Sequence, residues 1–255
     1  MMKRFRIGIF KLTSCDGCQV SLLNLEEALL DVLRFYDIAF FNEATDRKLQ
    51  GTFDIGIIEG SITTEAQKKE VFDIRERSRK IITIGACATS GGIQALRNWA
   101  SLNSYKRYVY PSAELIKTLS TSTPVSEHIY VDYELWGCPV STEALEEVLS
   151  SVVLEKTPGI PVYSLCMECK RRSIPCLLVS SGKPCLGPVT KAGCGALCPS
   201  MERPCYGCFG PKTGANIKAL ASIFEKNGIT EKEFLRILDQ MNSYAYRKAG
   251  LEKDG

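Results

Sequence analysis

The sequence has little of several features on which common protein chemistries depend. Its 255 residues include one histidine, His128, which leaves little for histidine-based metal catalysis or for a Ser/His/Asp triad. Neither a Gly-x-Gly-x-x-Gly fingerprint nor a Walker-type loop occurs, and Gly91-Gly92 lacks a phosphate-binding lysine. Nucleotide binding by this chain therefore has no support.

Long hydrophobic runs and a strong charge of one sign are also missing. No stretch reaches the roughly 18 apolar residues of a membrane span. The net charge of +3 is too small to indicate a nucleic-acid or membrane-surface partner. The start of the sequence, MMKRFRIGIFKLT, lacks the apolar run and small-residue cleavage site of a secretory signal. We expect a cytoplasmic protein that binds neither membrane nor nucleic acid.

Cysteine, in contrast, is abundant, with twelve residues in the chain. The cytosol keeps thiols reduced, so this number favours metal binding over disulfides. Eight of the twelve lie in one tract, in two sets of four with the spacings Cys-x2-Cys-x6-Cys-x8-Cys and Cys-x3-Cys-x6-Cys-x2-Cys. The first set is Cys166, Cys169, Cys176 and Cys185, and the second is Cys194, Cys198, Cys205 and Cys208.

Four thiolates match one [2Fe–2S] cluster, one [4Fe–4S] cluster or one structural zinc ion. A zinc ribbon joins two Cys-x2-Cys knuckles across about 15–20 residues. Here four further cysteines separate the knuckle Cys166/Cys169 from Cys205/Cys208. We favour two iron–sulfur clusters over two zinc sites, with disulfides the least favoured, and the basic side chains of the tract would stabilise an anionic cluster.

The same tract is rich in proline and glycine, which leaves little room for long helices. It therefore predicts a loop-rich, ferredoxin-like module, and because large apolar residues are few, its clusters are expected to act as its core. After Pro211 the pattern becomes helical, with a helix over 215–226 and a capping box, Thr230-x-x-Glu233, that begins a helix running to about Lys248. We expect these helices to pack on this subunit itself, with contact to a partner subunit as the alternative.

Residues 1 to about 155 alternate between strand-like and helix-like patterns. Strands are expected at 5–10, 37–41, 54–59, 80–85 and 129–135, and helices at 18–33, 63–78, 88–99 and 141–153. Strands that alternate with helices of this length predict βαβ units and a parallel sheet. The predicted fold is thus a flavodoxin-like α/β domain over residues 1–155, followed by an iron–sulfur domain with a helical tail over 156–255.

The remaining four cysteines all follow predicted strands. Cys15 and Cys18 come after the first strand, Cys87 after the fourth and Cys138 after the fifth. Loops beyond the carboxyl ends of parallel strands line the crevice where ligands bind, so these cysteines can meet although they are far apart in sequence. Helix N-termini begin at the same loops, and their amides would favour an anionic cluster.

Other interpretations of these four residues exist. Cys15 and Cys18 alone form a Cys-x-x-Cys pair of the kind used by dithiol oxidoreductases, and Cys87 or Cys138 alone would fit an inert core residue. A zinc-stabilised structural protein would use the same thiolates without iron. The division of twelve cysteines into three sets of four favours three clusters, which makes the chain an electron carrier whose chemistry happens on a partner.

Several motifs together resemble the small subunit of a [NiFe]-hydrogenase. They are the segment Cys15–Asn24 (CDGCQVSLLN), Glu59-Gly60, Gly85-Ala86-Cys87-Ala88, Gly137-Cys138-Pro139, and the segment Cys185–Thr190 (CLGPVT) with its Cys194. The resemblance covers nearly the whole chain to about Pro211. The related quinone-reductase subunit would show adjacent cysteines near Cys15 and no eight-cysteine tract, and it fits poorly.

The resemblance implies three [4Fe–4S] clusters and no catalytic residue on this chain. Its proximal cluster would be held by Cys15, Cys18, Cys87 and Cys138, its medial cluster by Cys194, Cys198, Cys205 and Cys208, and its distal cluster by Cys166, Cys169, Cys176 and Cys185. Membrane-associated and periplasmic members usually have a histidine where this chain has Cys166, and often lack the fourth medial cysteine that Cys198 supplies.

All-cysteine ligation resembles the cytoplasmic members, notably the delta subunit of archaeal NADP-linked hydrogenases, the sulfhydrogenases. The implied partners are a nickel–iron large (alpha) subunit, a flavin (gamma) subunit and a further iron–sulfur (beta) subunit. The implied activity is H2 oxidation or evolution coupled to NAD(P), with sulfur or polysulfide reduction in addition, and the NiFe centre, the flavin and NAD(P) would all lie on partner subunits.

Overall fold

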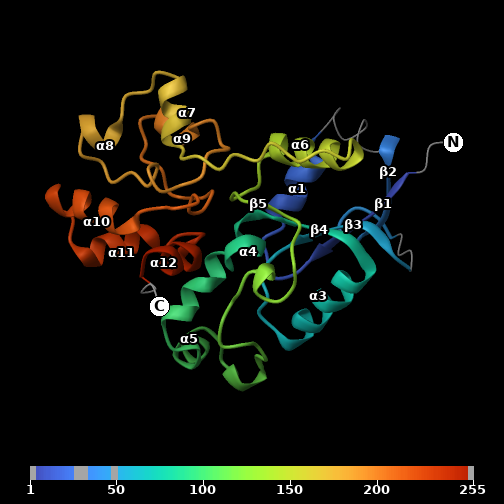
Figure 1. Ribbon diagram of the computed structural model, residues 1–255. Coiled ribbons are helices and arrows are strands. Elements are labelled where there is room, and N and C mark those ends of the chain that lie inside the picture. The colour runs from blue at the N-terminus through green and yellow to red at the C-terminus, as the bar shows by residue number, and fades with distance from the viewer. Residues whose placement is uncertain (1–3, 26–33, 47–50, 252–255) are drawn as a thin grey trace. The chain divides into compact units, whose positions relative to one another are not determined.

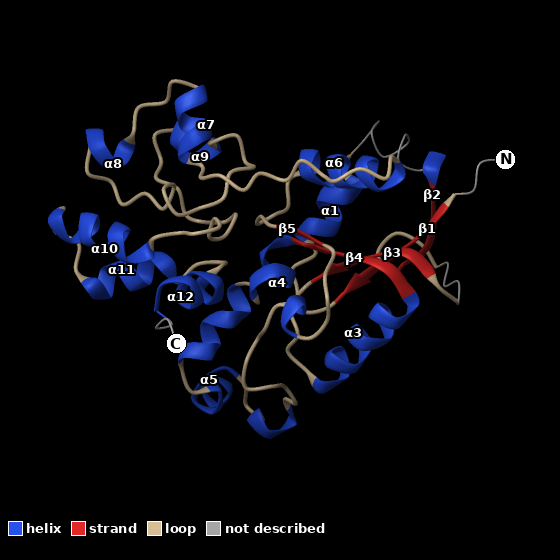
Figure 2. Ribbon diagram, in the orientation of Figure 1, coloured by secondary structure: helices blue, strands red, loops and turns tan. Residues whose placement is uncertain are grey.

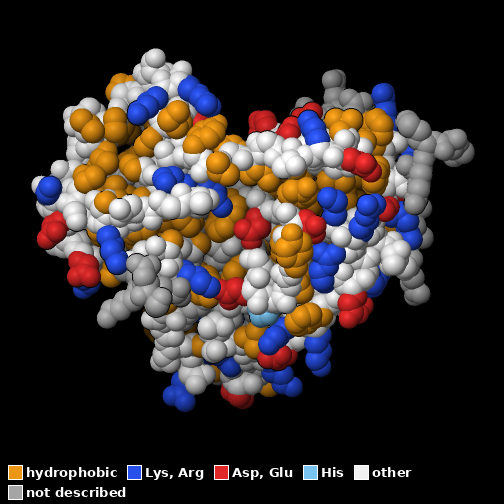
Figure 3. Space-filling view, in the orientation of Figure 1, with side chains coloured by type: hydrophobic (Ala, Val, Ile, Leu, Met, Phe, Trp, Pro, Cys, Tyr) orange, Lys and Arg blue, Asp and Glu red, His pale blue; other side chains and the backbone are white. Residues whose placement is uncertain are grey.

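The computed structural model describes residues 4–25, 34–46 and 51–251 (Figure 1). It divides into two compact units, residues 1–159 and residues 160–255. Charged side chains of both signs are spread over the visible face in Figure 3, as the small net charge of +3 requires. None of the helices in the described part is long and apolar enough to cross a membrane.

The first unit is built on a five-stranded parallel sheet with the strand order β2-β1-β3-β4-β5. The strands are β1 (Phe5–Lys11), β2 (Tyr36–Phe41), β3 (Phe53–Glu59), β4 (Ser78–Ile84) and β5 (Tyr133–Leu135). In this register Ile7 lies beside Ile55, and Ile57 beside Ile82. The order is that of flavodoxin-like folds, which confirms the predicted fold class.

The central strands are isoleucine-rich because helices cover both faces of the sheet. Ile55, Ile57 and Ile58 of β3 and Ile81, Ile82 and Ile84 of β4 are each at most 1% exposed. Strands buried on both sides read as continuous apolar runs rather than as alternating ones. In Figures 1 and 2, α1 and α6 lie on one face of the sheet and α3 on the other.

The helices of this unit follow the strands in sequence. They are α1 (Gly17–Leu23), α3 (Glu65–Arg77), α4 (Gly85–Ser90), α5 (Leu102–Val109) and α6 (Thr142–Val153), with 3-10 turns η1 (Ile93–Trp99), η2 (Ala113–Leu115) and η3 (Val125–Glu127). Helix α1 begins where expected, and the rest of the predicted helix to residue 33 includes 26–33, which lie outside the described residues. The last strand is shorter than predicted, since Ile129 still belongs to the turn closed by its amide on Val125 O.

The single helix predicted over 88–99 is wrong. The structure has α4 and η1 instead, separated by Gly91 and Gly92, whose φ angles are +80° and +67°. A left-handed pair of residues ends a right-handed helix, and glycine adopts this conformation without a steric cost. The break lets Gly91 pack so closely on Ser122 that an added Cβ would lie 2.8 Å from the Ser122 carbonyl oxygen.

The described part of the second unit has three short helices in its cysteine tract and three longer ones in its tail. The first are α7 (Cys166–Arg171), α8 (Leu177–Ser180) and α9 (Leu197–Ser200), and the second are α10 (Ile217–Lys226), α11 (Glu231–Leu238) and α12 (Ser243–Leu251). The loop-rich tract and the helical tail were both predicted. The capping box is also present, with Thr230 accepting from the Glu233 amide and Glu233 from the Thr230 amide.

The second unit has an apolar core of its own, in addition to the clusters that are expected to act as the core of its cysteine tract. Leu220, Phe224 and Phe234 of the tail pack with Leu186 and Val189 of the cysteine tract. The sulfurs of Cys185 and Cys205 are buried in the same cluster. The tail therefore supplies the large side chains that the tract lacks.

The helix predicted from Thr230 to Lys248 is interrupted, so this expectation was also wrong. Helix α11 ends at Leu238 and α12 begins at Ser243. Between them Asp239 forms an ion pair with Arg247, with 2.6 Å between the charged atoms, and Asn242 is completely buried. The break turns Asn242 toward the cysteine tract, where its amide binds two backbone carbonyl groups.

A core substitution in β3 should destabilise the first unit strongly. Ile57→Ala removes a fully buried side chain and leaves a cavity in the sheet, which costs about 2–5 kcal/mol. Ile93→Ala is the matched control, because Ile93 is 53% exposed. Chemical denaturation of the two variants should show a large fall in the unfolding midpoint for Ile57→Ala only, and equal midpoints would contradict this description of the core.

Candidate metal centres

The sheet brings four cysteines from three loops to one edge of the first unit. Cys15 and Cys18 flank the start of α1 after β1, Cys87 lies in the first turn of α4 after β4, and Cys138 follows β5. Burial is the main cause that raises the pKa of Cys18 well above its usual value, and the nearby charges of Glu59, Cys87 and Cys138 add to it. The four thiols are therefore neighbours, and none forms a disulfide.

The same neighbours act on the other thiols of this group. Burial raises the pKa of Cys87 to about 11, with further contributions from Cys138, Cys15 and Glu59. Burial and then Cys15 raise the pKa of Cys138. Thiols this close to one another resist ionisation because their negative charges repel, and Cys18 and Cys87 are also wholly or partly buried. A bound metal centre would compensate that charge.

Glycine allows the cysteine loops to approach one another closely. Gly85, at the start of α4, has a φ of +81°, and a Cβ at this position would collide with Cys18 Sγ. A Cβ on Gly92 would lie 2.7 Å from Cys87 Sγ. The Ala86 amide donates to the Gly137 carbonyl, 2.7 Å away, which joins the loop of Cys87 to that of Cys138.

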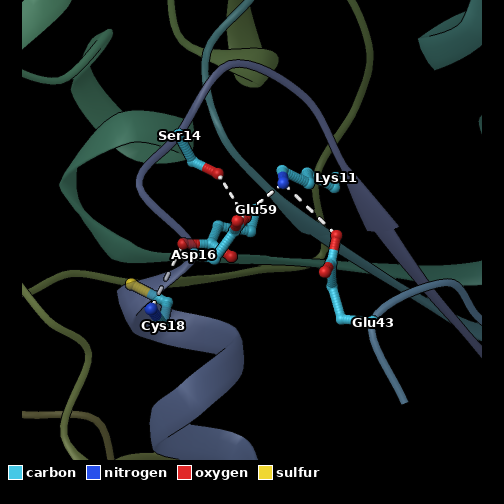
Figure 4. Close-up of polar contacts among 6 residues, drawn as sticks. All are labelled: Lys11, Ser14, Asp16, Cys18, Glu43 and Glu59. Carbon is cyan, nitrogen blue, oxygen red and sulfur yellow. Dashed lines mark hydrogen bonds and ion pairs between the residues drawn. The ribbon is translucent and has the colours of Figure 1, made fainter.

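Ionic and polar contacts brace the Cys15–Cys18 turn (Figure 4). Asp16 has a left-handed backbone, with a φ of +65°. Its carboxylate is 2.6 Å from Lys11 Nζ and accepts from Ser14 Oγ at 3.3 Å, while Lys11 also reaches Glu43. These contacts hold the turn in the conformation that places both sulfurs at the edge of the sheet.

Glu59, the last residue of β3, is a site residue whose role the sequence did not predict. It is 1% exposed, and its Oε1 accepts from the Cys18 amide at 3.2 Å (Figure 4). Burial raises its pKa, against the lowering effect of the amides of Cys18 and Gln19. These amides at the start of α1 therefore bind the Glu59 carboxylate. The sequence alone predicts that such amides favour an anionic cluster and does not predict their contact with Glu59. A charged residue that ends a buried strand, DIGIIE, is the signal that could have found it.

Gln94 is a second residue that sequence reasoning missed. Its Nε2 donates to the Thr13 carbonyl at 2.7 Å and lies 3.6 Å from Cys87 Sγ. It thereby joins the loop after β1 to the thiol after β4. Glutamine in a glycine-rich turn carries no signal of its own, so only the structure identifies this contact.

In the second unit Cys166, Cys169, Cys176 and Cys185 form one group. Burial raises the pKa of Cys166 to about 11, and Cys185, Cys169 and Cys176 contribute in that order. Burial and then Cys185 and Cys176 raise the pKa of Cys169. The four residues come from α7, from the N-cap position of α8 and from the loop that follows. This is the set that the spacing suggested.

The last four cysteines interact with one another as two pairs, Cys194 with Cys198 and Cys205 with Cys208. Cys198 raises the pKa of Cys194, after the larger effects of burial and Glu168, and Cys208 raises that of Cys205, after burial and Cys185. The Cys205 amide also donates to Cys185 Sγ at 3.2 Å, so the two sets of this unit are adjacent. Glu168 accepts from the amides of Gly193 and Ala196, at 2.8 and 2.9 Å, which secures the loop of Cys194.

The donor chemistry of each set fits an iron–sulfur cluster. Each set offers thiols only, and thiolates are the usual ligands of such clusters. Within the described ranges, no three Cys, His, Asp or Glu side chains converge closely enough to hold a single metal ion. A cluster, which contains several irons and sulfides, needs ligands spread more widely than those of one ion.

Comparison with known proteins identifies the family. The model of the family described as "NADH ubiquinone oxidoreductase, 20 Kd subunit" matches residues 15–152. The delta subunit of sulfhydrogenase 2 from Pyrococcus furiosus is 36% identical over 233 residues, covering 91% of this chain and 97% of that subunit. This chain belongs to the hydrogenase small-subunit family.

Two further hydrogenase subunits agree with this assignment. A vhu subunit of the F420-non-reducing hydrogenase from Methanococcus voltae is 33% identical, and the match covers 94% of this chain and 93% of that subunit. A chain in the crystal structure of an NAD+-reducing [NiFe]-hydrogenase superposes with a TM-score of 0.58 at 27% identity, covering 62% of this chain and 96% of that chain. The resemblance noted in the motifs is thus confirmed, and the chain is a subunit of a hydrogenase complex.

A methyl group at Gly85 should damage the first cysteine group selectively. Gly85→Ala strains the backbone by about 1–2 kcal/mol and pushes against Cys18 Sγ. We expect anaerobically purified protein to lose about four irons per chain, one cluster, in metal analysis.

Gly228→Ala is the control for this prediction. Gly228 has a φ of +83°, almost the same as Gly85, but an added Cβ meets nothing within 4 Å. The control should keep the iron content of the unaltered protein. An equal loss in both variants would mean that backbone strain, and not the contact with Cys18, explains the effect.

Proposed function

We propose that this hydrogenase small subunit transfers electrons through three [4Fe–4S] clusters, each held by one of the three cysteine sets. The observation that carries the proposal is the meeting of Cys15, Cys18, Cys87 and Cys138 at one edge of the sheet, with Gly85 against the Cys18 sulfur. A dithiol oxidoreductase would use only Cys15 and Cys18 and would leave Cys87 and Cys138, from two other loops, without a role.

In this proposal the residues of this chain hold the clusters and position the loops that carry the cysteines. Lys11 and Asp16 fix the turn that carries Cys15 and Cys18, Glu59 orients the Cys18 amide, and Glu168 secures the loop of Cys194. Bound at these cysteines, the clusters supply one-electron redox chemistry. The buried surroundings exclude water from the sulfurs of Cys18, Cys185 and Cys205, which favours a defined redox potential.

The partners follow from the family. Hydrogenase small subunits act with a large subunit, and we propose a nickel–iron large subunit that splits or forms H2. The name of the Pyrococcus furiosus relative, a sulfhydrogenase, supports sulfur reduction as a second capacity. The NAD+-reducing hydrogenase supports an NAD(P)-linked acceptor reached through flavin and further iron–sulfur subunits, and the F420-non-reducing relatives support an acceptor other than F420. We place the complex in the cytoplasm.

Loss of one cysteine in the second unit should separate electron transfer from hydrogen activation. Cys198→Ala removes one proposed ligand at α9, so the last set holds its cluster poorly and H2-dependent dye reduction should fall about tenfold or more. Hydrogen–deuterium exchange by the large subunit needs no electron transfer through this chain and should be largely retained. Both rates are measured on the same purified complex.

Ser200→Ala is the control in the same short helix. The Ser200 hydroxyl donates to the Leu197 carbonyl in its own helix, at 2.7 Å, so both rates should stay near those of the unaltered complex. Equal loss of dye reduction and isotope exchange in Cys198→Ala would point to failed assembly. Full dye reduction with full iron content would contradict the role proposed for Cys198.

A further inference from the structure

The last helix of the chain inserts a tyrosine hydroxyl beside the cysteine tract. Tyr246 of α12 is 0% exposed, although tyrosine is large and carries a polar group. Its hydroxyl lies 2.8 Å from Thr190 Oγ1 and 3.2 Å from the Gly207 carbonyl oxygen. A Cβ on Gly207 would lie 2.8 Å from this hydroxyl, so the tail and the Cys205–Cys208 loop are in direct contact.

Thr190 continues this line of hydroxyl groups to a sulfur. Its side chain is 1% exposed, and its Oγ1 lies 3.7 Å from Cys205 Sγ and 2.7 Å from the Leu186 carbonyl oxygen. The Gly207 amide donates to the same sulfur at 3.3 Å. Cys205 therefore has two polar neighbours in a buried site, one of which is itself in contact with Tyr246.

Asn242 is a second residue that attaches the tail to the same loop. Its Nδ2 donates to the Gly207 carbonyl at 3.0 Å and to the Cys208 carbonyl at 2.8 Å, and the residue is completely buried. Both carbonyl groups belong to the loop that carries Cys205 and Cys208. Buried amide hydrogen bonds of this kind fix backbone geometry, because breaking them leaves polar groups unpaired.

We infer that the helical tail positions and tunes the redox centre held by Cys205, through the hydroxyl pair of Tyr246 and Thr190. This inference rests on the proposed function, in which Cys205 ligates an iron–sulfur cluster. Tyr246 and Thr190 are positioning residues here, and Asn242 holds the loop on which Cys205 lies. The tail thus has a part in electron transfer in addition to its packing.

The direction of the effect follows from the donors. A free Cys205 thiol donates its hydrogen to Thr190 Oγ1, but a metal-bound thiolate has no hydrogen and only accepts. The Thr190 hydroxyl has one hydrogen, which it donates to the Leu186 carbonyl, and with a metal-bound thiolate this hydrogen turns to the sulfur, while the Leu186 carbonyl keeps the amides of Val189 and Thr190. A hydrogen bond from Tyr246 to the Thr190 oxygen strengthens that donation. Donors to ligand sulfur stabilise the more negative, reduced state of a cluster, so they raise its reduction potential.

The test is a redox titration, followed by electron paramagnetic resonance, of the purified hydrogenase complex. Thr190→Val removes the hydroxyl and should lower one cluster's potential so that its ratio of reduced to oxidised forms changes about tenfold, or 59 mV for one electron. Thr190→Ser keeps the hydroxyl and should restore the original potential. Tyr246→Phe should shift the same cluster in the same direction by a smaller amount.

Tyr36→Phe is the matched control for Tyr246→Phe. Tyr36 is 2% exposed, and its hydroxyl donates to the Leu149 carbonyl in the first unit, so the same hydroxyl is lost elsewhere. This variant should leave all potentials unchanged. A shift with Tyr246→Phe that is no larger than with Tyr36→Phe, in protein with its full iron content, would overturn the inference and leave the proposed function standing.

The remaining outcomes are also distinguishable. If Thr190→Val loses iron, the shift in Tyr246→Phe, which retains the aromatic ring, decides the question. If Thr190→Ser behaves like Thr190→Val, the hydroxyl is not the cause, and the inference fails. Unaltered complex whose small subunit binds no iron would overturn the proposed function itself.

Discussion

The parallel direction of the strands is the constraint on which the first site depends. Because β1, β4 and β5 run the same way, the loops that follow them leave from one edge of the sheet. This places Cys15, Cys87 and Cys138 close together although they lie far apart in the sequence. The close approach is then completed by local features, above all the absence of a side chain at Gly85. Closely spaced thiolates repel one another, so a bound metal centre would stabilise their charge.

The second unit positions its cysteines without a sheet. Its cysteines lie in short helices and loops, and the tract has too few large side chains to bury by itself. The tail supplies both apolar and polar side chains to the tract. Phe224 joins the apolar core, and the Tyr246 hydroxyl contacts Thr190, which in turn contacts the sulfur of Cys205. The three tail helices thus form this core, and α12 is also the element through which we propose that the redox centre is tuned.

The sequence predicted the elements that periodicity and cysteine spacing control. The parallel α/β fold, the four cysteines at strand ends and the capping box at Thr230 all follow from local patterns. Features that depend on tertiary contact were not predictable. The helix expected over 88–99 breaks because Gly91 packs on Ser122, and the tail helix breaks where Asn242 turns to the carbonyl groups of Gly207 and Cys208. Glu59 and Gln94 were missed because their importance lies in which backbone and sulfur atoms they face.

Metal and sulfide analysis of the anaerobically purified small subunit, with electron paramagnetic resonance after reduction, tests the central claim most directly. Three four-iron clusters require about twelve irons and twelve sulfides in the small subunit, with interacting signals from the reduced clusters. That result would support electron transfer through all three cysteine sets. About four irons with zinc in addition would leave only the group at the sheet edge as a redox site. No iron in intact protein would contradict the account.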